Sequence, residues 1–342
     1  MGKDMSKGQQ PVSVVIPTWN AAAFVDRVLE ALTKQQGVEY EILVVDNGVV
    51  NADTEAVANR HREYFPNLRY LKFERQLGYA GAVNAGAAAA QYPLVAVMNN
   101  DNIPEARWLV ELLSVFEAEA TERSSVIVGS LIERPGFSDP LGCNLNFWAR
   151  IVRVPGWRRN RNLFHPDGSA FLFDKRVFPV PYDEDYFVYQ EDVALGWRAW
   201  LEGHRVLLAE KSRGVSFDGG STRRIAYKTA YFTERNRWIN YLCYLSIPNL
   251  LCALPALFLD NLFKLAFGKQ RGAKLHAWAW LVVDPGHIWN CRQAIQKNRK
   301  RHDRDILPLL SGSYRGSDES GRVILNGLFR FLCSACGLKL GR

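Results

Sequence analysis

Four short apolar runs, each followed by a polar turn and mostly by a segment of helical character, occupy the first ~120 residues of this chain. The runs cover residues 12–16, 41–46, 68–73 and 93–98. Strands that alternate with helices predict right-handed βαβ units, so we expect an α/β fold with a mostly parallel sheet and helices on both faces. With 342 residues, 48% of them hydrophobic, the chain is long and apolar enough to bury such a core.

The sequence also predicts two helices. Apolar residues recur at helical spacing over 21–36, and a second stripe runs from Trp108 to Phe116. We expect Pro104 at the first helical position before the second stripe, where its missing N–H costs nothing.

Polar side chains follow three of the four strands. Residues 17–20, 46–48 and 99–102 each come directly after an apolar run. Ligands of open α/β sheets bind outside the carboxyl ends of the strands, so these segments are predicted to meet at one edge. Asp46 and Asp101 lie there, and a carboxylate is costly to bury without a donor or a cation. Helix capping is the alternative interpretation for each.

The chemistry of these side chains indicates a nucleotide and a metal. Oxygen ligands with amide neighbours suit Mg²⁺ or Mn²⁺, which makes Asp101 the metal candidate. Asp46 is able to accept a hydrogen bond from the N3–H of uracil or thymine, a proton that cytosine lacks. Trp19 offers a face for a base or ribose, although a tryptophan is often simply core. The net charge of +8 and the sequence pI near 9.2 agree with an anionic partner.

Other nucleotide-binding motifs are missing from the sequence. Gly78, Gly81 and Gly86 do not form the dinucleotide fingerprint, and no Walker motif occurs. A Rossmann dehydrogenase or a P-loop enzyme is therefore disfavoured. Further along, Glu191 and Asp192 begin an amphipathic helical segment, where the helix dipole favours an ionised carboxylate able to take the proton of an attacking hydroxyl. A purely structural role in the first turn is the alternative.

Six segments in this order resemble the inverting family 2 glycosyltransferases, and among them the rhamnosyltransferase-like members, over roughly residues 12 to 240. The segments are Val-Ser-Val-Val-Ile-Pro-Thr-Trp-Asn at 12–20, Val-Val-Asp-Asn at 44–47, Leu-Gly-Tyr-Ala-Gly-Ala-Val-Asn-Ala-Gly at 77–86, Asn-Asn-Asp at 99–101, Tyr-Phe-Val-Tyr-Gln-Glu-Asp-Val-Ala-Leu-Gly-Trp-Arg at 186–198 and Arg-Asn-Arg at 235–237.

The resemblance implies a GT-A fold, a nucleotide-diphosphate sugar donor and a divalent cation. It makes Asp192 the catalytic base, with Glu191 beside it, and Asp101 the metal-binding carboxylate. The positions implied at the donor are Pro17, Thr18, Trp19, Asn20, Asp46, Gly78, Asn84 and Asn100. The implied domains are a disordered tail (1–10), a catalytic domain (11–235, with a nucleotide-sugar half 11–104 and an acceptor half 105–235) and a helical, amphipathic C-terminal region (236–342).

The chain departs from the family pattern at two positions. Phe217 stands where the family usually has a histidine that is a further metal ligand, and a phenyl ring cannot ligate. Asp218 is the candidate substitute; more water on the metal, or weak metal dependence, are the alternatives. Gln76 replaces the usual asparagine, which leaves a detail of the donor pocket open.

The C-terminal region contains an uncharged run, 238–259, that prolines interrupt, and basic residues follow it. Basic side chains beside aromatic ones suit helices at an anionic membrane surface, and a helical appendage packed on the catalytic domain or on a twin subunit is the alternative. The N-terminal segment has no apolar core typical of a secretory signal, and the six cysteines are scattered. We therefore expect a cytoplasmic protein, peripheral at the inner face of the cell membrane; a homodimer stays open.

The predicted function is transfer of a rhamnose-like or other hexose from a UDP- or dTDP-sugar to a hydroxyl of a glycan or lipid-linked glycan, in cell-surface polysaccharide synthesis. The alternatives are a polyprenyl-phosphate sugar synthase and a non-catalytic nucleotide-sugar-binding subunit. No nucleic-acid recognition motif is present, so no nucleic-acid partner is expected.

Overall fold

The computed structural model describes residues 10–48, 52–122, 124–134, 147, 162–217, 226–310, 331, 334, 338 and 340. The chain forms two compact units. The sheet unit comprises Met1–Gly142, Pro166–Asp192 and Arg205–Ser221, and the helical unit comprises Cys143–His165, Val193–His204 and Thr222–Arg342.

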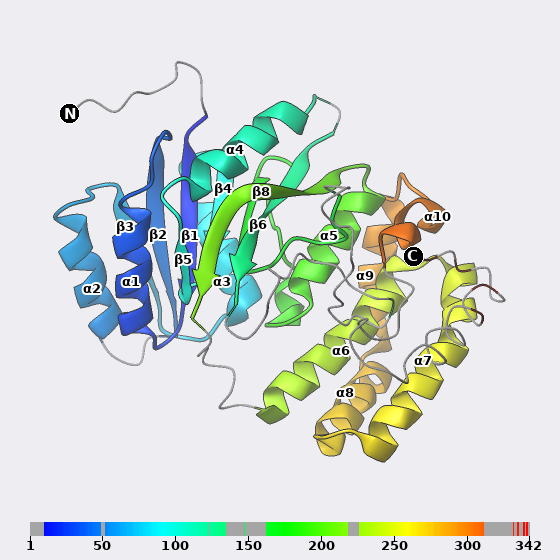
Figure 1. Cartoon of the computed structure of the whole chain (residues 1–342). Coiled ribbons are helices and arrows are strands. Elements are labelled where there is room, and N and C mark those ends of the chain that lie inside the picture. Colours follow the sequence, from blue (N-terminus) through cyan, green and yellow to red (C-terminus); the bar gives the residue numbers. More distant parts are fainter. Residues whose placement is uncertain are drawn as a thin grey trace, which may run out of the picture. The chain divides into compact units, whose positions relative to one another are not determined.

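The sheet unit is built on one eight-stranded sheet with the order β3-β2-β1-β4-β7-β6-β8-β5 (Figure 1). Its strands are β1 (Val12–Thr18), β2 (Tyr40–Asn47), β3 (Leu68–Phe73), β4 (Leu94–Met98), β5 (Asn102–Pro104), β6 (Val126–Glu133), β7 (Ala170–Asp174) and β8 (Arg205–Ser216). The first four strands pair in parallel, as predicted. β7 pairs antiparallel with both β4 and β6, while β6 and β8 are parallel.

Helices cover both faces of the parallel strands. The helices of this unit are α1 (Ala22–Leu32), α2 (Asp53–Arg62), α3 (Gly78–Ala89) and α4 (Trp108–Glu119), and α5 (Glu191–Leu201) begins in it. Val14 and Ile16 belong to the core that α1 and α4 complete, whereas Val15 lies against Gly86 of α3. All seven residues of β1 are buried, as expected of a strand with both faces covered.

The prediction for Pro104 is wrong. Pro104 ends β5, which pairs with β8 at the edge of the described sheet, and α4 begins at Trp108. Proline is tolerated in an edge strand because one side of that strand needs no ladder hydrogen bond. The predicted helical stripe itself is present in α4.

In the helical unit, the uncharged run 238–259 is divided between two helices. They are α6 (Ala226–Tyr244) and α7 (Ile247–Phe267), and α8 (Arg271–Val283), α9 (Pro285–Lys297) and α10 (Asp303–Ile306) follow. Pro248 lies in the first turn of α7, where it suits a helix start, and Pro255 lies inside the helix.

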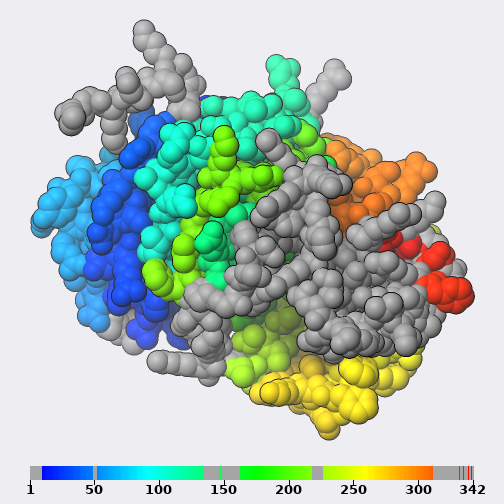
Figure 2. Space-filling view, in the orientation of Figure 1, coloured from blue at the N-terminus to red at the C-terminus, as the bar shows by residue number. Residues whose placement is uncertain are grey.

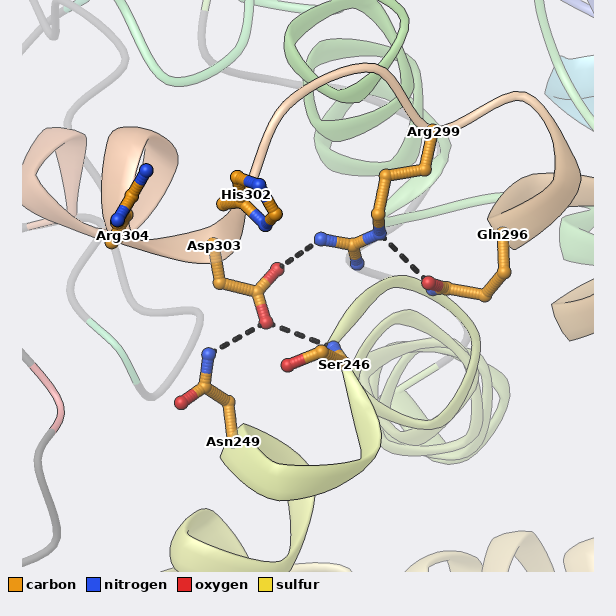
Figure 3. Close-up of a pocket in the computed structure, with 7 residues that line it drawn as sticks. All are labelled: Ser246, Asn249, Gln296, Arg299, His302, Asp303 and Arg304. Carbon is orange, nitrogen blue, oxygen red and sulfur yellow. Dashed lines mark hydrogen bonds and ion pairs between the residues drawn. The ribbon is translucent and has the colours of Figure 1, made fainter.

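Side chains that follow α6 along the chain close its C-terminal end. Arg292 donates to the carbonyls of Leu242 and Leu245, at 2.5 and 2.8 Å, and Arg299 donates to that of Tyr244. Arg299 also pairs with Asp303, which accepts from the backbone of Ser246 and from Asn249 beside a cavity of about 280 Å³ (Figure 3). The hydrogen bonds and ion pair drawn there all involve Arg299 or Asp303, which cap the ends of α6 and α7, so we interpret the cavity as structural.

Candidate active site

The ends of β1, β2 and β4 meet at one edge of the sheet, as predicted. Thr18 and Asp46 are direct partners in the β1–β2 register. The Asn100 side-chain amide donates to the Thr18 hydroxyl at 2.9 Å, which links the turn after β4 to the end of β1. The three polar segments therefore come together, with Asp101 next to Asn100.

Asp46 is 2% exposed at the end of β2. Burial raises the pKa of its carboxyl, while hydrogen bonds from the hydroxyls of Tyr70, at 2.8 Å, and Thr54 act in the opposite direction. Both hydroxyls fix the orientation of the carboxylate. Sequence reasoning missed Tyr70 and Thr54, because neither lies next to Asp46 in the chain.

The turn before α3 is attached to the end of β2. The Asn47 side chain accepts from the Leu77 amide at 2.6 Å and donates to the Gly78 carbonyl at 2.9 Å. Gly78 has a φ of +76°, and a Cβ there would meet the Phe187 carbonyl oxygen at 2.4 Å. Only glycine fits this close approach.

The remaining donor-side candidates take different places. Pro17 is buried in β1, Trp19 is half-buried and Asn20 is exposed, with a φ of 48°. Asn84 exchanges two hydrogen bonds with the Tyr182 backbone, at 2.8 and 3.1 Å, so its amide ties α3 to the segment that precedes α5. Their contacts with a nucleotide stay predictions.

Asp192 lies against a turn that precedes β7. The Gly168 amide donates to Asp192 Oδ2 at 3.3 Å, and a Cβ on Gly168 would lie 3.0 Å from the Asp192 Cβ. The neighbouring Asp167 accepts from Arg134 at 2.7 Å and from the Ser169 amide at 3.0 Å. Burial alone would raise the pKa of Asp167, but Arg134 and the Ser169 hydrogen bonds outweigh it and hold the pKa below its ordinary value.

Tyr79 connects this turn to the end of β4. Its hydroxyl lies 2.7 Å from Asn99 Oδ1 and 2.5 Å from the Gly168 carbonyl oxygen. Burial raises its pKa well above 10, and the negative charges of Glu191, Asp192, Asp167 and Asp101 add to the increase. Asp101 and Asp192, the predicted metal ligand and base, thus both lie within electrostatic reach of one hydroxyl.

Glu191 is buried beside Asp192. Burial, with the Asp192 charge as the second cause, raises the pKa of Glu191 to about 8. Its Oε2 has no hydrogen-bond partner among the described residues. The loop before it holds Phe187, Tyr189 and Gln190 at positive φ between 60° and 69°, a conformation that costs energy in non-glycine residues. Such strain is common at functional sites.

Sequence reasoning did not single out Tyr79, Asp167, Gly168 or Arg134. Tyr79 lies within the 77–86 segment, in which only the glycines and Asn84 were predicted to have a role. The other signal was the polar Pro-Asp-Gly-Ser turn at 166–169, directly before an apolar strand.

The surroundings of Asp101 fit a divalent cation. Burial is the main cause of the raised pKa values of Tyr79 and Glu191, and nearby carboxylates, Asp101 among them at Tyr79, add to the increase, so the local electrostatics favour a cation. Phe217 donates its backbone amide to the Asp101 carbonyl at 2.8 Å, and its ring lies 5.3 Å from the Arg27 guanidinium. Asp218, the second metal candidate, lies outside the described residues.

A groove of about 360 Å³ lies beside Phe217. It is lined by Arg27, Glu30, Ala31, Lys34, Ile103, Pro104, Ala106 and Phe217. Its lining residues come mainly from α1 and from the segment of β5, and Figure 2 shows the blue of α1 near the yellow-green of β8. None of the three predicted carboxylates lines it.

Comparisons with known proteins agree with this geometry. Residues 13–178 match the family model described as Glycosyl transferase family 2. The chain is 33% identical over 241 residues to a validoxylamine A glucosyltransferase of Streptomyces hygroscopicus subsp. jinggangensis, covering 60% of this chain and 54% of the relative. It is 25% identical over 270 residues to the N-acetylglucosaminyl-diphospho-decaprenol L-rhamnosyltransferase of Mycobacterium tuberculosis, covering 66% and 84%.

A solved structure of GalNAc-T7 with UDP, GalNAc and Mn²⁺ has a TM-score of 0.58 at 16% identity, covering 73% of this chain and 51% of that one. At that identity the likeness shows the fold. The chain spans about half the length, or less, of the first curated relatives it matches.

The fold, the acidic sheet edge and these matches define the class of this domain: it is a glycosyltransferase domain with a GT-A-like α/β fold. The domain at residues 13–178, which carries this sheet edge, matches the model of glycosyl transferase family 2. The predicted family, enzyme class and fold class are confirmed.

Proposed function

We propose that this chain is an inverting glycosyltransferase that moves a rhamnose-like or other hexose from a UDP- or dTDP-sugar to a hydroxyl of a glycan or glycolipid. The observation that carries the proposal is the convergence around Tyr79, which has both Asp101 and Asp192 within electrostatic reach, while Thr18 and Asn100 join Asp46 to the same edge. An inverting transfer needs a nucleotide pocket, a cation that compensates the charge of the diphosphate, and a base. Asp46, Asp101 and Asp192 would serve these needs in turn, Asp101 by holding the cation.

Asp192 is the proposed base. The Gly168 amide holds one of its carboxylate oxygens, which fixes the direction in which the group accepts a proton. The acceptor hydroxyl gives its proton to Asp192 as its oxygen attacks the anomeric carbon from the face opposite the diphosphate. The bond to the diphosphate breaks, the leaving group keeps the bonding electrons, and the configuration inverts. Because Glu191 keeps its proton through neutral pH, it does not add a second charge beside the base.

Asp46 is the proposed acceptor for the N3–H of uracil or thymine. Tyr70 and Thr54 hold the carboxylate in place before a donor arrives, so little ordering is required on binding. We infer that Trp19 lies along the base or ribose, and that Asn20, Gly78 and Asn100 line the rest of the donor site. Asp101 would hold Mg²⁺ or Mn²⁺, and the cation would supply positive charge to the departing diphosphate.

The proposed acceptor is a lipid-linked glycan, and the proposed place of action is the inner face of the cell membrane, in cell-surface polysaccharide synthesis. The printed name of the mycobacterial relative, which describes a sugar carried on a diphospho-decaprenol, supports this acceptor class. The exposed apolar helix α7 supports peripheral contact with a membrane.

The test is a transfer assay with UDP- and dTDP-sugars and Mn²⁺, on the wild type and on Asp192→Asn. We expect the variant to lose at least ~100-fold in kcat, since a general base contributes 10²–10⁴-fold, and to keep the donor-induced rise in melting temperature. Unchanged turnover would favour a polyprenyl-phosphate sugar synthase, whose phosphate acceptor needs no strong base. Donor binding without any turnover in the wild type would indicate a non-catalytic subunit.

A further inference from the structure

Helix α7 exposes many of its apolar side chains and buries polar ones. Its buried residues are Ala253, Leu257, Asp260 and Asn261, which recur at helical spacing on one face. Seven large apolar residues point outward and are between 46% and 75% exposed: Ile247, Leu251, Phe258, Leu259, Leu262, Phe263 and Phe267. We call these seven residues the α7 apolar face. In a helix of a water-soluble domain the arrangement is normally the opposite.

A buried charge cluster holds α7 in this orientation. It consists of Glu234 and Arg237 of α6 with Asp260 and Lys264 of α7, whose side chains are 13% exposed or less. Arg237 donates to Asp260 at 3.0 Å and to Glu234 at 2.5 Å, and Lys264 lies 2.7 Å from Asp260. A rotation that turned the apolar face inward would leave these charges without partners.

The cluster has further support from both sides. Arg237 also donates to the Asn261 side chain at 2.6 Å, and the Trp278 indole of α8 donates to Glu234 at 3.3 Å. Residues of two other helices of the unit, α6 and α8, therefore gather on the same side of α7 (Figure 1). The contacts of the buried charge cluster within the helical unit therefore hold the apolar face outward.

Basic residues lie next to the apolar face. From residue 261 to residue 283 the sequence contains Lys264, Lys269, Arg271 and Lys274 and no aspartate or glutamate. Lys269 and Arg271 are exposed at the α7–α8 turn, directly after Phe267. Arg271 donates to the carbonyls of Ala266 and Gly268, so its position follows the end of α7. An apolar stripe bordered by cations matches an anionic bilayer surface.

A second copy of this chain fits the face less well. In a two-fold symmetric contact each patch meets itself, and Lys269, Arg271 and Lys274 would then approach their own copies. Like charges at an interface oppose association, whereas an anionic lipid surface compensates all of them at once.

The length of α7 does not by itself make it a spanning helix. With 21 residues and a mean hydropathy of 1.7 it is long and apolar enough to cross a membrane. However, Asp260 and Lys264 would enter the hydrocarbon together with Arg237 and Glu234 of α6, and charged groups there are costly. A helix lying parallel to the surface avoids this cost, because the buried charge cluster then faces the protein.

We propose that α7 lies in the plane of an anionic phospholipid bilayer, with its apolar face inserted among the lipid chains and Lys269, Arg271 and Lys274 at the headgroups. The inference rests on the proposed function for its biological role, since a lipid-linked acceptor would be presented at that surface.

The test uses the full chain and vesicles of phosphatidylcholine with or without phosphatidylglycerol, in a co-sedimentation assay. We expect binding to the phosphatidylglycerol vesicles at least ~10-fold tighter than to pure phosphatidylcholine, and weaker as salt rises. Leu259→Glu combined with Phe263→Glu is expected to abolish binding to both. Lys269→Glu combined with Lys274→Glu is expected to remove only the preference for the anionic lipid.

The control is Tyr64→Glu, which replaces an 81% exposed apolar side chain of the sheet unit with one glutamate and should leave binding unchanged. Each variant must also keep its melting temperature and its UDP-sugar-induced shift, both measured without vesicles. If vesicle binding is lost while the melting temperature and the donor-induced shift are kept, the loss is due to α7. If the wild type shows no donor-induced shift, the proposed function fails instead.

Three results would overturn the proposal. Equal pelleting of the wild type and the Leu259→Glu/Phe263→Glu variant would exclude the apolar face as the contact, and a dimer that this variant dissociates would make the face an interface between copies. The in-plane orientation has its own readout: the bound protein should move to sucrose-loaded acceptor vesicles of the same composition within minutes. Retention on the first vesicles would instead indicate a spanning helix.

Discussion

The Gly168 amide donates to the Asp192 carboxylate at 3.3 Å, across 24 residues of sequence. The Cβ that Gly168 lacks would lie 3.0 Å from the Asp192 Cβ and 3.2 Å from Oδ2. Contacts this short force a neighbour to shift. The proposed base, Asp192, can therefore occupy its position only because residue 168 has no side chain.

Gly168→Ala is expected to lower kcat by ~10–100-fold, because a displacement of a reacting group by about 1 Å costs up to that much. The added methyl group displaces the Asp192 carboxylate while leaving its chemistry unchanged. Steady-state transfer kinetics measure the effect. Gly286→Ala is the matched control, since its Cβ would meet nothing within 4 Å. Equal activity of the two variants would show that the amide contact does not position the base.

Tyr79→Phe is expected to lower the free energy of unfolding by about 1–3 kcal/mol, because it leaves the Asn99 and Gly168 carbonyl oxygens without the hydroxyl. It should also lower kcat, since Tyr79 joins the end of β4 to the turn that holds Asp192. Urea unfolding and transfer kinetics measure the two effects. A loss of stability with unchanged kcat would limit Tyr79 to a structural role.

Glu191 makes stability depend on pH. Its pKa is raised to about 8 by burial, from an ordinary value near 4.5, so the folded state holds a proton that the unfolded state has lost between these values. The stabilisation by protonated Glu191 is full below pH about 4.5 and disappears as pH rises through about 8. Glu191→Gln cannot titrate. We expect the wild type to lose up to a few kcal/mol relative to this variant between pH 5 and 8.

Urea denaturation of both proteins at several pH values in this range provides the measurement. The comparison with Glu191→Gln cancels the titration of the other groups that the two proteins share. Parallel stability curves would mean that Glu191 ionises normally in the folded protein.

The sequence predicted the parallel strands and the helices between them, because helical periodicity and short β-branched runs are local patterns. The third predicted strand, 68–73, has the same bounds as β3, and the strand ends did bring the segments of Asp46 and Asp101 to one edge. The turn at 167–169 could not be located in the same way. It reaches the end of β4 because β7 inserts antiparallel beside that strand, with Met98 opposite Ala170. Pairing between strands 72 residues apart produces no periodic pattern in the sequence, so the sequence does not predict it.

The same limit explains Pro104 and the C-terminal helices. A proline before an apolar stripe is typical of a helix start, but pairing with β8, about 110 residues later, makes it the end of an edge strand. The predicted uncharged run, 238–259, covers the end of α6 and only the first part of α7. The outward direction of the α7 apolar face depends on Glu234 and Arg237 of another helix, and a hydropathy profile does not contain that pairing.

Asp101→Asn is expected to weaken Mn²⁺ binding in the presence of UDP by at least ~10-fold, since hard divalent cations prefer charged oxygen ligands and take few from the protein. Isothermal titration with Mn²⁺ measures the affinity without requiring turnover. Glu122→Gln removes one negative charge at an exposed position and should leave the affinity unchanged. Similar affinities for the wild type and Asp101→Asn would assign the cation to other ligands.

Asp46 is expected to select the base of the donor. UDP- and dTDP-sugars should raise the melting temperature, because a ligand that binds only the folded state stabilises it, whereas GDP-sugars should not. Asp46→Asn replaces an acceptor-only carboxylate with an amide that must already satisfy the Tyr70 and Thr54 hydroxyls, so the shift from uracil and thymine donors should shrink. Differential scanning fluorimetry with the three donors, with and without Mn²⁺, gives the comparison. Equal shifts from all three in the wild type would remove the base-reading role of Asp46 and leave its carboxylate as a support for the end of β2.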